Sequence, residues 1–359
     1  MFDEYKGKKV LITGHTGFKG SWLSAWLINL GSEVYGISDD IPTSPSNFEA
    51  IKLQDRMQDF RVDLLDLEKI KKIIYKIKPD YVFHLGAQAL VKLSYENPLK
   101  TININAIGTA NILESLREID HQVNLVTITS DKAYDNLEIE RGYKETDILG
   151  GKDPYSASKG MAELVIKTYF HSFFKEKRNN IRIGVTRAGN VIGGGDWAKY
   201  RIVPDCMKAW AKKETVQIRN PESTRPWQHV LEPLGGYLLL GIILAKKEKI
   251  NGEAFNFGPS KENNFSVIDL LKEMQKYWPE VMWKNSSRVK EEIYEAKLLR
   301  LNCEKAERIL NWKPILSFEE TAKITVDWYK KFYYGEDMLN ISLEQIKFFT
   351  ELLKIRNQD

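Results

Sequence analysis

The sequence predicts an α/β fold, in which a doubly wound parallel sheet is followed by a smaller C-terminal α/β domain. Strand-like apolar runs alternate with helix-like segments as far as residue 187. A glycine-rich turn, TGHTGFKG at residues 13–20, joins the first strand to the first helix. Beyond residue 187 the alternation breaks, and loops with interspersed helices follow. Two connected domains are therefore expected, and a chain of 359 residues is long enough for both.

The first half contains six expected strands, at residues 9–13, 33–37, 58–62, 80–85, 123–129 and 181–186. The helices expected between them cover residues 21–30, 67–77, 104–118 and 156–175. Strands separated by helices form βαβ units, and right-handed crossovers place helices on both faces of a parallel sheet. The predicted architecture is therefore of the Rossmann type.

The second half is expected to cover the carboxyl edge of the sheet. Glycine-rich or polar loops are expected at 189–197 and 219–230. The helices expected among and after these loops cover residues 204–212, 233–245, 267–277, 317–331 and 343–355. No internal repeat interrupts this pattern, so the second domain is predicted to be a single small unit.

Composition argues against several functional classes. The net charge of +4 is small and no dense Lys/Arg cluster occurs, so we expect no nucleic-acid partner. The N-terminus is polar, and the longest apolar run, 238–245, is too short to span a membrane. Five histidines without a Cys/His cluster predict no metal site. The two cysteines are expected to be reduced thiols in a cytoplasmic protein.

The glycines of the turn at 13–20 are expected to bind phosphate. Gly14, Gly17 and Gly20 let the backbone turn tightly and approach a pyrophosphate. The helix that follows offers free N–H groups and the positive end of its dipole. The spacing at the first strand-to-helix turn therefore predicts a dinucleotide site. The loop adds to the expected cofactor contacts Thr16, Phe18 and Lys19.

Acidic residues at two strand ends point to the identity of the dinucleotide. Asp39 follows the second strand, nineteen residues after Gly20. A carboxylate there accepts hydrogen bonds from the adenosine ribose hydroxyls and repels a 2′-phosphate, which favours NAD over NADP. Asp40 is an alternative for this role, and Asp63 is expected to reach the adenine edge. The remaining expected cofactor contacts are Leu64, Leu85, Ala87 and Gln88.

A tyrosine and a lysine four residues apart are the main catalytic candidates. Tyr155 and Lys159 in DPYSASKGMAE share one face of a predicted helix. A free tyrosine with a pKa of about 10 is a poor base at neutral pH. A neighbouring ammonium and the positive charge of an oxidised nicotinamide both favour the phenolate. The pair therefore suits removal of a hydroxyl proton while hydride leaves for NAD, and both residues are also expected to contact the cofactor.

Several motifs together resemble a known family. The order of TGxxGxxG, HLGAQ at 84–88, a strand that ends in Thr-Ser, and YxxxK resembles the extended short-chain dehydrogenase/reductase superfamily. Within it, TSDKAYDN, LGGKDPYSASKG, RAGNVIGGGDW and RPWQHVLEPLGGYL closely resemble the CDP-glucose 4,6-dehydratase family. The similarity covers roughly residues 5–330. It implies oxidation of a sugar at C4, loss of water across C5 and C6, and return of hydride to C6, with NAD regenerated.

The resemblance also implies roles for the polar residues that end the fifth strand. Tyr155 would deprotonate the sugar O4, and Thr129 would hydrogen-bond to the same oxygen. Asp131 is expected to act as an acid toward the C6 hydroxyl and Lys132 as a base at C5. Both roles need shifted pKa values, which burial favours. A structural salt bridge between Asp131 and Lys132 is the alternative.

The resemblance places the nucleotide sugar mainly in the second half of the chain. Its diphosphate is expected to meet arginine side chains, because guanidinium groups match phosphate oxygens. Trp227 is expected to pack in the core rather than to stack on a base. The expected substrate contacts are Asn190, Arg219, Arg225, His229 and Tyr294.

The resemblance further implies a division of the chain. Residues 1–187 would bind NAD, with segments near 228–257 returning to this domain. Residues 188–227 and 258–335 would bind the nucleotide sugar, and 336–359 would form a C-terminal helical tail. A homodimer or homotetramer that pairs through the helices at 104–118 and 156–175 is expected by analogy.

Three alternatives remain open from the sequence. The chain could dehydrate another nucleotide sugar, such as a GDP-linked N-acetylhexosamine. It could be a nucleotide-sugar epimerase, although such an enzyme has no need for the Asp131–Lys132 pair. In a different class, it could be a non-catalytic NAD-binding regulatory protein, which has no need for Thr129, Tyr155 and Lys159 together.

Overall fold

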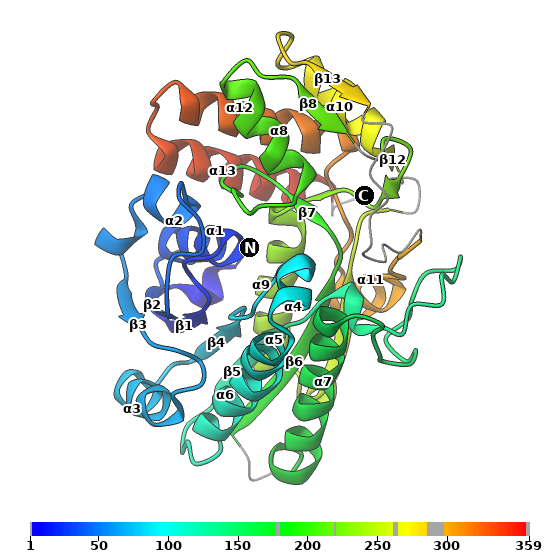
Figure 1. The fold of residues 1–359 in the computed structure, drawn as a ribbon. Coiled ribbons are helices and arrows are strands. Elements are labelled where there is room, and N and C mark those ends of the chain that lie inside the picture. Colours follow the sequence, from blue (N-terminus) through cyan, green and yellow to red (C-terminus); the bar gives the residue numbers. More distant parts are fainter. Residues whose placement is uncertain (1, 177–179, 219, 261–264, 286–297, 357–359) are drawn as a thin grey trace.

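A computed structural model describes residues 2–176, 180–218, 220–260, 265–285 and 298–356. A seven-stranded sheet with every pair parallel forms its centre, in the order β11-β6-β5-β4-β1-β2-β3 (Figure 1). The strands are β1 Lys9–Thr13, β2 Glu33–Ser38, β3 Gln58–Arg61, β4 Tyr81–His84, β5 Val123–Ile128, β6 Ile181–Ala188 and β11 Glu253–Phe257. The fold class predicted from the sequence is confirmed. The edge strand β11 was not among the six expected strands.

Helices cover both faces of the sheet because successive strand residues point to opposite sides. In β1, Val10 and Ile12 join the core shared with α1 (Phe18–Asn29) and α9 (Leu231–Lys246). Leu11 points the other way, into a second core. The helices that pack on that second core are α3 Leu67–Ile77, α6 Gly108–Leu116 and α7 Pro154–Tyr169. The sheet is thus buried on both faces, as is usual for parallel sheets.

Most predicted helices differ from the structure at their ends, and the one expected at 343–355 begins at Met338. Two of the differences lie in the sheet domain beside α7. The helix expected at 104–118 is preceded by α5 (Pro98–Ile102), and its first residues form a π-helical stretch, Asn103–Ile107. The helix expected at 156–175 begins two residues earlier, with Pro154 at its first turn and Asp153 accepting a hydrogen bond from Ser156 N at 2.9 Å. Proline fits the first turn of a helix, where no N–H is needed. This cap sets the start of α7 and therefore the position of Tyr155 in its first turn.

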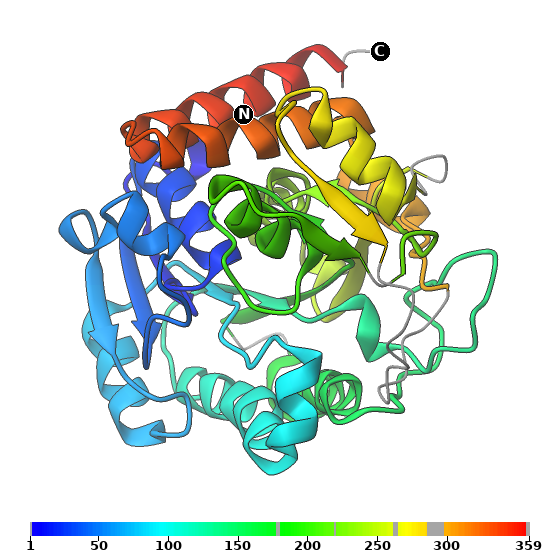
Figure 2. The ribbon, with the colours of Figure 1, turned by 45° about the horizontal axis from the view of Figure 1, so that its top comes forward.

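The rest of the chain lies over the carboxyl ends of the strands (Figures 1 and 2). Its helices are α8 Ile202–Ala211, α10 Val267–Gln275, α11 Glu304–Leu310, α12 Phe318–Tyr333 and α13 Met338–Arg356. Two-stranded pairs join β7 Val191–Ile192 to β10 Gln228–His229, β9 Thr224–Arg225 to β12 Phe265–Ser266, and β8 Val216–Ile218 to β13 Trp283–Asn285. Short helices α2 Asn47–Ala50 and α4 Val91–Glu96 follow β2 and β4.

The C-terminal helix α13 joins the two parts of the molecule. Figure 2 shows α12 and α13 side by side, and α13 also contacts α1 of the sheet domain. The rings of Trp26 and Phe349 meet edge to face at 5.7 Å, and Trp328 donates to Ser342 Oγ at 2.9 Å. The predicted helical tail is therefore a packed helix as far as Arg356. No helix of the described residues has the length and apolar content to cross a membrane.

Candidate active site

The glycine-rich turn lies where the strand order reverses, between β1 and β4. Gly14 has φ +72°, and a Cβ there would stand 2.8 Å from Gly86 N, at the end of β4. A Cβ on Gly20 would stand 2.1 Å from the Gly14 carbonyl oxygen. Gly17 caps α1 without a side-chain hydrogen bond, so the first N–H groups of α1 remain available to an anion. This cradle fits a dinucleotide pyrophosphate, which binds at such a reversal point.

The ends of β2 and β3 complete the expected adenosine side. Thr16 donates to the Asp40 carbonyl oxygen at 2.7 Å, which ties the glycine turn to the segment holding Asp39 and Asp40. Both carboxylates are exposed. Burial, and then the neighbouring Asp39, raise the pKa of Asp40. Asp63 is exposed and accepts from Leu65 N at 2.9 Å. The geometry places Asp39 and Asp40 alike at this end and does not choose between them.

The other expected cofactor contacts follow β3 and β4. Leu64 is buried, and a Cβ on Gly86 would stand 2.7 Å from its Cδ1. Leu85 and Ala87 are half-buried. The Gln88 side chain donates to Thr101 Oγ1 at 3.0 Å and to the Leu90 carbonyl oxygen at 3.0 Å. Its amide therefore braces α5 from within, and the geometry does not favour it as a cofactor contact.

Tyr155 and Lys159 lie buried on the first turns of α7. The Lys159 ammonium is 6.0 Å from the centre of the Tyr155 ring. Burial raises the pKa of Tyr155 to about 12, although a hydrogen bond with Ser130 lowers it. Burial lowers the pKa of Lys159 to about 8, opposed by the Glu163 carboxylate. The lowered tyrosine pKa expected from the sequence is thus absent from the chain alone, because desolvation outweighs the nearby positive charges.

Asp131 is a buried carboxyl directly beyond the β5 strand. Its Oδ1 accepts a hydrogen bond from Ser130 Oγ at 2.9 Å. Burial raises the pKa of Asp131, and the charges of Lys132 and Lys19 oppose this rise. A raised pKa is the direction that a proton donor needs.

The side chains of Lys132 and Asp131 line different cavities. Lys132 is half-buried and lines a small cavity with Tyr134, Asn136 and Ser156, whereas Asp131 lines a larger neighbouring one. Asp131 and Lys132 are both described, and no ion pair joins them. The salt-bridge alternative is therefore not what the structure shows.

The hydroxyl beside Tyr155 belongs to Ser130 and not to Thr129. Thr129 donates to Glu163 Oε1 at 2.6 Å and also lies 3.0 Å from the Thr186 carbonyl oxygen. Its single proton is therefore used within the core, on the α7 side of the sheet. Ser130, one residue further, donates to Asp131 at 2.9 Å. It also stands close enough to the Tyr155 hydroxyl to lower the pKa of that group. The geometry does not support the expected contact of Thr129 with the sugar O4.

A cavity of about 340 Å³ opens beside Asp131. Gly189 and Pro226 line it, and a Cβ on Gly189 would stand 3.2 Å from Asp131 Oδ2. Basic side chains from two other segments, Arg141, Lys144 and Arg300, line it as well. Glu140 and Glu304 line it too, and Lys144 Nζ lies 3.8 Å from a Glu304 carboxylate oxygen. The buried acid and the basic groups suit a sugar attached to a diphosphate.

Comparison with known proteins places this site in a family. The family model for GDP-mannose 4,6 dehydratase matches residues 11–325. The chain belongs to this dehydratase family. The CDP-glucose 4,6-dehydratase of Salmonella typhimurium is 44% identical over 346 residues, covering 95% of this chain and 96% of that protein. The dTDP-glucose 4,6-dehydratase of Haemophilus influenzae is 26% identical, covering 89% and 97%.

The fold agrees with solved structures of related proteins. An epimerase from Methanothermobacter thermautotrophicus matches with a TM-score of 0.81 at 26% identity, covering 93% of this chain and 95% of that one. The resemblance recognised in the sequence is confirmed, and with it the assignment of an enzyme of the hydro-lyase class.

The predicted substrate contacts of this dehydratase are only partly brought together. Asn190 is exposed beside Gly189 of the cavity, and Arg225 in β9 is half-buried beside Pro226. His229 is fully buried against Trp22, with ring centres 6.2 Å apart, and burial lowers its pKa to about 3. Such a neutral core histidine is removed from the substrate cavity, so this expectation is not supported. Arg219 and Tyr294 lie outside the described residues.

Trp227 packs as expected. It is buried, and its Nε1 donates to the Phe265 carbonyl oxygen at 3.0 Å. The interpretation of Trp227 as a core residue is confirmed by this contact.

Sequence reasoning missed Arg201 and understated Lys19. Arg201 pairs with Asp196 at 2.8 Å, and its charge lowers the pKa of Tyr155. Burial, then the charge of Arg201, lower the pKa of Lys19 to about 8, while Asp131 opposes them. Arg201 thus acts on Tyr155, and Lys19 acts on Asp131. The signal available in the sequence was a basic residue shortly after the GGGDW loop and a lysine inside the glycine turn.

Proposed function

We propose that this dehydratase converts CDP-glucose to CDP-4-keto-6-deoxyglucose, with NAD regenerated in every cycle. One observation carries the proposal: a buried carboxyl, Asp131, shares Ser130 with the Tyr155 hydroxyl beyond the strand end. Tyr155 suits oxidation at C4, and Asp131 suits the loss of water that an epimerase does not need. The cytidine part rests on the 44% identical relative from Salmonella typhimurium.

The first step is proton removal from the sugar O4. NAD, when bound in the glycine cradle, accepts hydride from C4 and later returns it to C6. Tyr155 takes the O4 proton, and the ammonium of Lys159 stabilises the phenolate that forms. Ser130, rather than Thr129, is proposed to hydrogen-bond to O4 beside Tyr155.

The second step is elimination across C5 and C6. The new 4-ketone acidifies the C5 proton, which Lys132 removes, while Asp131 gives its proton to the leaving C6 hydroxyl. Water leaves and a C5–C6 double bond forms. A proton from the Lys132 ammonium, which exchanges with solvent, returns to C5 as hydride returns to C6. The O4 proton held by Tyr155 passes through Ser130 to Asp131, which restores the protonation of both residues. The hydride lost at C4 is recovered at C6, and no external reductant is consumed.

The basic residues in the lining of the larger cavity, which also includes Glu140 and Glu304, are proposed to hold the diphosphate and nucleotide. Arg141 is tied to Asp147 by two hydrogen bonds of 2.9 and 2.7 Å, which fixes its guanidinium at the cavity wall. Lys144 and Arg300 add positive charge from neighbouring segments.

We further propose a cytoplasmic location, because Cys206 and Cys303 are free thiols, as a reducing compartment favours.

Mass spectrometry of product mixtures tests the reaction and the base together. The purified protein is incubated with CDP-, dTDP-, UDP- and GDP-hexoses without added reductant. We expect loss of one water from CDP-glucose alone. Loss of water from a different nucleotide sugar would keep the mechanism but overturn the substrate. An isomer of unchanged mass would identify an epimerase, and an absence of any product with NAD bound would favour a binding protein.

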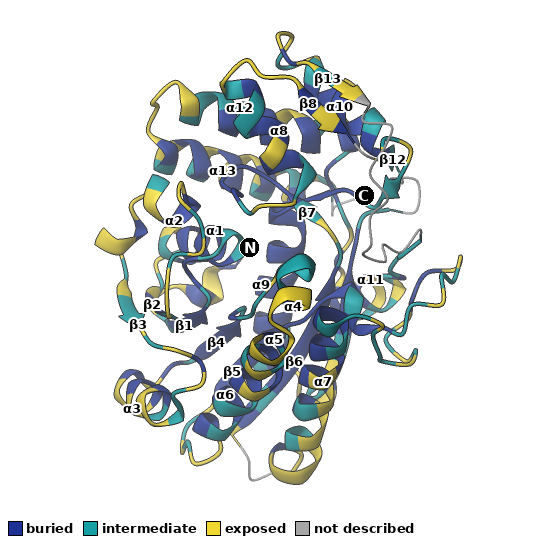
Figure 3. Cartoon of the chain, viewed as in Figure 1, coloured by how far each residue is buried: buried dark blue, intermediate teal, exposed yellow. Residues whose placement is uncertain are grey.

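We propose that the enzyme pairs as a homodimer through α7 and the helical segments beside it. Large apolar side chains are exposed there, including Leu99 at 74%, Ile107 at 48% and Leu164 at 55%. Figure 3 shows exposed residues along both α5 and α7. The π-helical stretch and α6 pack beside α7, so these side chains belong to one region of the surface. Exposed apolar residues grouped in this way favour burial against a second copy.

Leu164→Glu tests the homodimer. A charge in an apolar interface costs several kcal/mol of association energy because it loses its hydration, so the variant is expected to be monomeric. Light scattering should then give the 41.5 kDa mass of one chain, against twice that mass for the wild type. Tyr334→Glu, at a side chain 73% exposed beyond α12, is the matched control and should leave the dimer intact. A monomeric wild type would contradict the proposal.

A further inference from the structure

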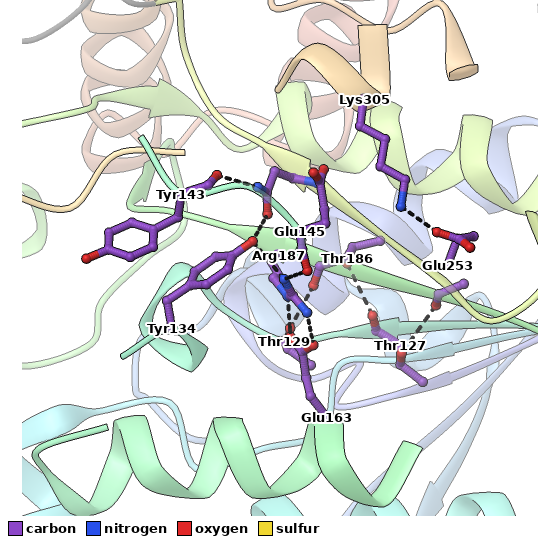
Figure 4. A network of polar contacts seen from close by, with 12 residues as sticks. Thr127, Thr129, Tyr134, Tyr143, Glu145, Glu163, Thr186, Arg187, Glu253 and Lys305 are labelled. Atoms are coloured by element: carbon purple, nitrogen blue, oxygen red, sulfur yellow. Dashed lines mark hydrogen bonds and ion pairs between the residues drawn. The ribbon is translucent and has the colours of Figure 1, made fainter. Parts of the chain in front are cut away.

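A buried ion pair stands behind the catalytic helix, between Glu163 of α7 and Arg187 of β6. Both side chains are only 4% exposed. Arg187 Nε donates to Glu163 Oε1 at 2.7 Å, and its Nη2 donates to the second carboxylate oxygen. Figure 4 shows this bidentate pair at the centre of a larger polar network. The two residues are called the hub below.

On one side, the hub holds the elements that carry the chemistry. Glu163 lies one helical turn after Lys159, on the same face of α7. Its Oε1 also accepts the Thr129 hydroxyl at 2.6 Å, directly before Ser130. Glu163 therefore fixes both α7 and the end of β5 at the point where Tyr155 and Asp131 approach Ser130.

On the other side, the hub reaches two tyrosines and an asparagine. Arg187 Nη1 donates to the Tyr134 hydroxyl at 2.7 Å and to the Glu145 carbonyl oxygen at 3.1 Å. The Tyr134 hydroxyl in turn donates a hydrogen bond to Asn256 Oδ1 at 2.8 Å. Asn256 Nδ2 then donates to the carbonyl oxygens of Tyr143 at 2.8 Å and Asn302 at 3.1 Å.

Asn302 belongs to the wall of the larger cavity, and Tyr143 lies between two residues of that wall, Gly142 and Lys144. Gly142 and Asn302 both line it, as do Arg300 and Leu301. The two wall segments are joined directly, because Asn302 N donates to the Tyr143 carbonyl oxygen at 2.8 Å. A continuous chain of buried hydrogen bonds thus runs from the catalytic helix through the hub to the cavity wall (Figure 4).

Stability alone is a weak reason for such a pair. Desolvation of two charges often offsets their attraction, and apolar residues of similar volume serve as well or better. A fully satisfied polar network does hold its members in a single arrangement. Catalysis needs such a single arrangement, because displacing a catalytic group by about 1 Å can lower the rate about a hundredfold.

We propose that Glu163 and Arg187 are positioning residues that couple occupation of the nucleotide cavity to the alignment of Tyr155 and Lys159. The inference rests on the proposed function, because the cavity is taken as the nucleotide site. Neither residue touches the sugar. Arg187 holds the wall through Tyr134, and Glu163 holds the catalytic face of α7.

Tyr134→Phe tests the link to the wall with the loss of one oxygen atom. The ring and its stacking on Tyr143, with centres 4.9 Å apart, are retained. We expect kcat/KM for CDP-glucose to fall by about tenfold, with unchanged NAD affinity measured by calorimetry, since a buried charge-assisted hydrogen bond is lost. The matched control is Glu253→Gln, which removes the 2.6 Å pair with Lys305 next to the network. It should leave kcat/KM unchanged.

Glu163→Gln tests the link to the catalytic face by its pH profile. The titratable groups around the Lys159 ammonium are Tyr155 and Glu163 of α7, His84 of β4 and Lys19 of α1. Glu163 is the one carboxylate among them and raises the pKa of Lys159. Its loss should move the alkaline limb of the C4-oxidation rate, read from reduced cofactor in a single turnover, down by about one to two pH units. A purely structural role would lower thermal stability without moving this limb.

Folding of the variants and the proposed function are checked separately. If Glu163→Gln alone fails to fold, the double variant Glu163→Gln with Arg187→Met removes both charges and should fold. Its kcat/KM should still be about tenfold below that of the wild type. Wild-type turnover is measured in the same assay, and its absence would contradict the proposed function. Normal wild-type turnover with Tyr134→Phe within twofold of it, or an unmoved alkaline limb in Glu163→Gln, would overturn the role of the hub.

Discussion

Tyr155→Phe is expected to lower kcat for CDP-glucose by about three orders of magnitude while NAD stays bound. The phenylalanine ring fills the same buried space on α7 but has no oxygen to take the O4 proton. The glycine cradle at Gly14, Gly17 and Gly20 is untouched, so the pyrophosphate contacts remain. Hydride cannot leave C4 until the hydroxyl proton has a place to go, and every later step depends on that oxidation.

The measurement is steady-state formation of the dehydrated product, together with the NAD content of the purified protein. Tyr95→Phe on α4 is the matched control, because this ring is 42% exposed and takes no part in the site. It should keep wild-type turnover. A Tyr155→Phe variant that retained a tenth of the wild-type kcat would rule out this tyrosine as the base.

Asp131→Asn is expected to separate oxidation from dehydration. The amide keeps the shape of the carboxyl and its hydrogen bond with Ser130, but it has no proton to give to the C6 hydroxyl. We expect reduced cofactor to build up after CDP-glucose is added, while loss of water slows by about a hundredfold to a thousandfold. Because burial raises the pKa of Asp131, the wild-type carboxyl is protonated below that pKa. Water loss should therefore decline as the pH rises through it.

Lys132→Met distinguishes the base from the acid. In D2O the wild type and Asp131→Asn should exchange deuterium into C5, whereas Lys132→Met should not. Asp135→Asn, three residues after Lys132 in the same segment, is the control and should behave as the wild type. Persistent C5 exchange in Lys132→Met would assign the base elsewhere, and normal water loss in Asp131→Asn would assign the acid elsewhere.

Much of the catalytic architecture could be predicted from local patterns. The glycine turn needs only a strand, a helix and three glycines at a fixed spacing, all within Lys9–Asn29. Tyr155 and Lys159 are neighbours because residues four apart share a face of any helix. The doubly wound parallel sheet could also be predicted, since strands alternate with helices and βαβ crossovers have one hand.

Contacts between distant segments could not be predicted in this way. Thr129 and Ser130 are adjacent in sequence, but successive residues of an extended chain point to opposite sides, so the sequence could not show which hydroxyl meets Tyr155. The burial of His229, the approach of Arg201 to Tyr155, and the use of the Gln88 amide within the fold depend on how loops pack over the sheet.

Glu163 and Arg187 give the clearest contrast. Each reads as an ordinary charged residue in its own helix or strand, twenty-four positions apart. Their partnership arises only because α7 packs across β6, which brings both side chains into a space that excludes water. Short-range periodicity could therefore predict the elements and the cofactor loop. The orientation of the acid, the hydroxyl beside the base and the hub emerge from long-range packing, because burial and side-chain direction are properties of the assembled core.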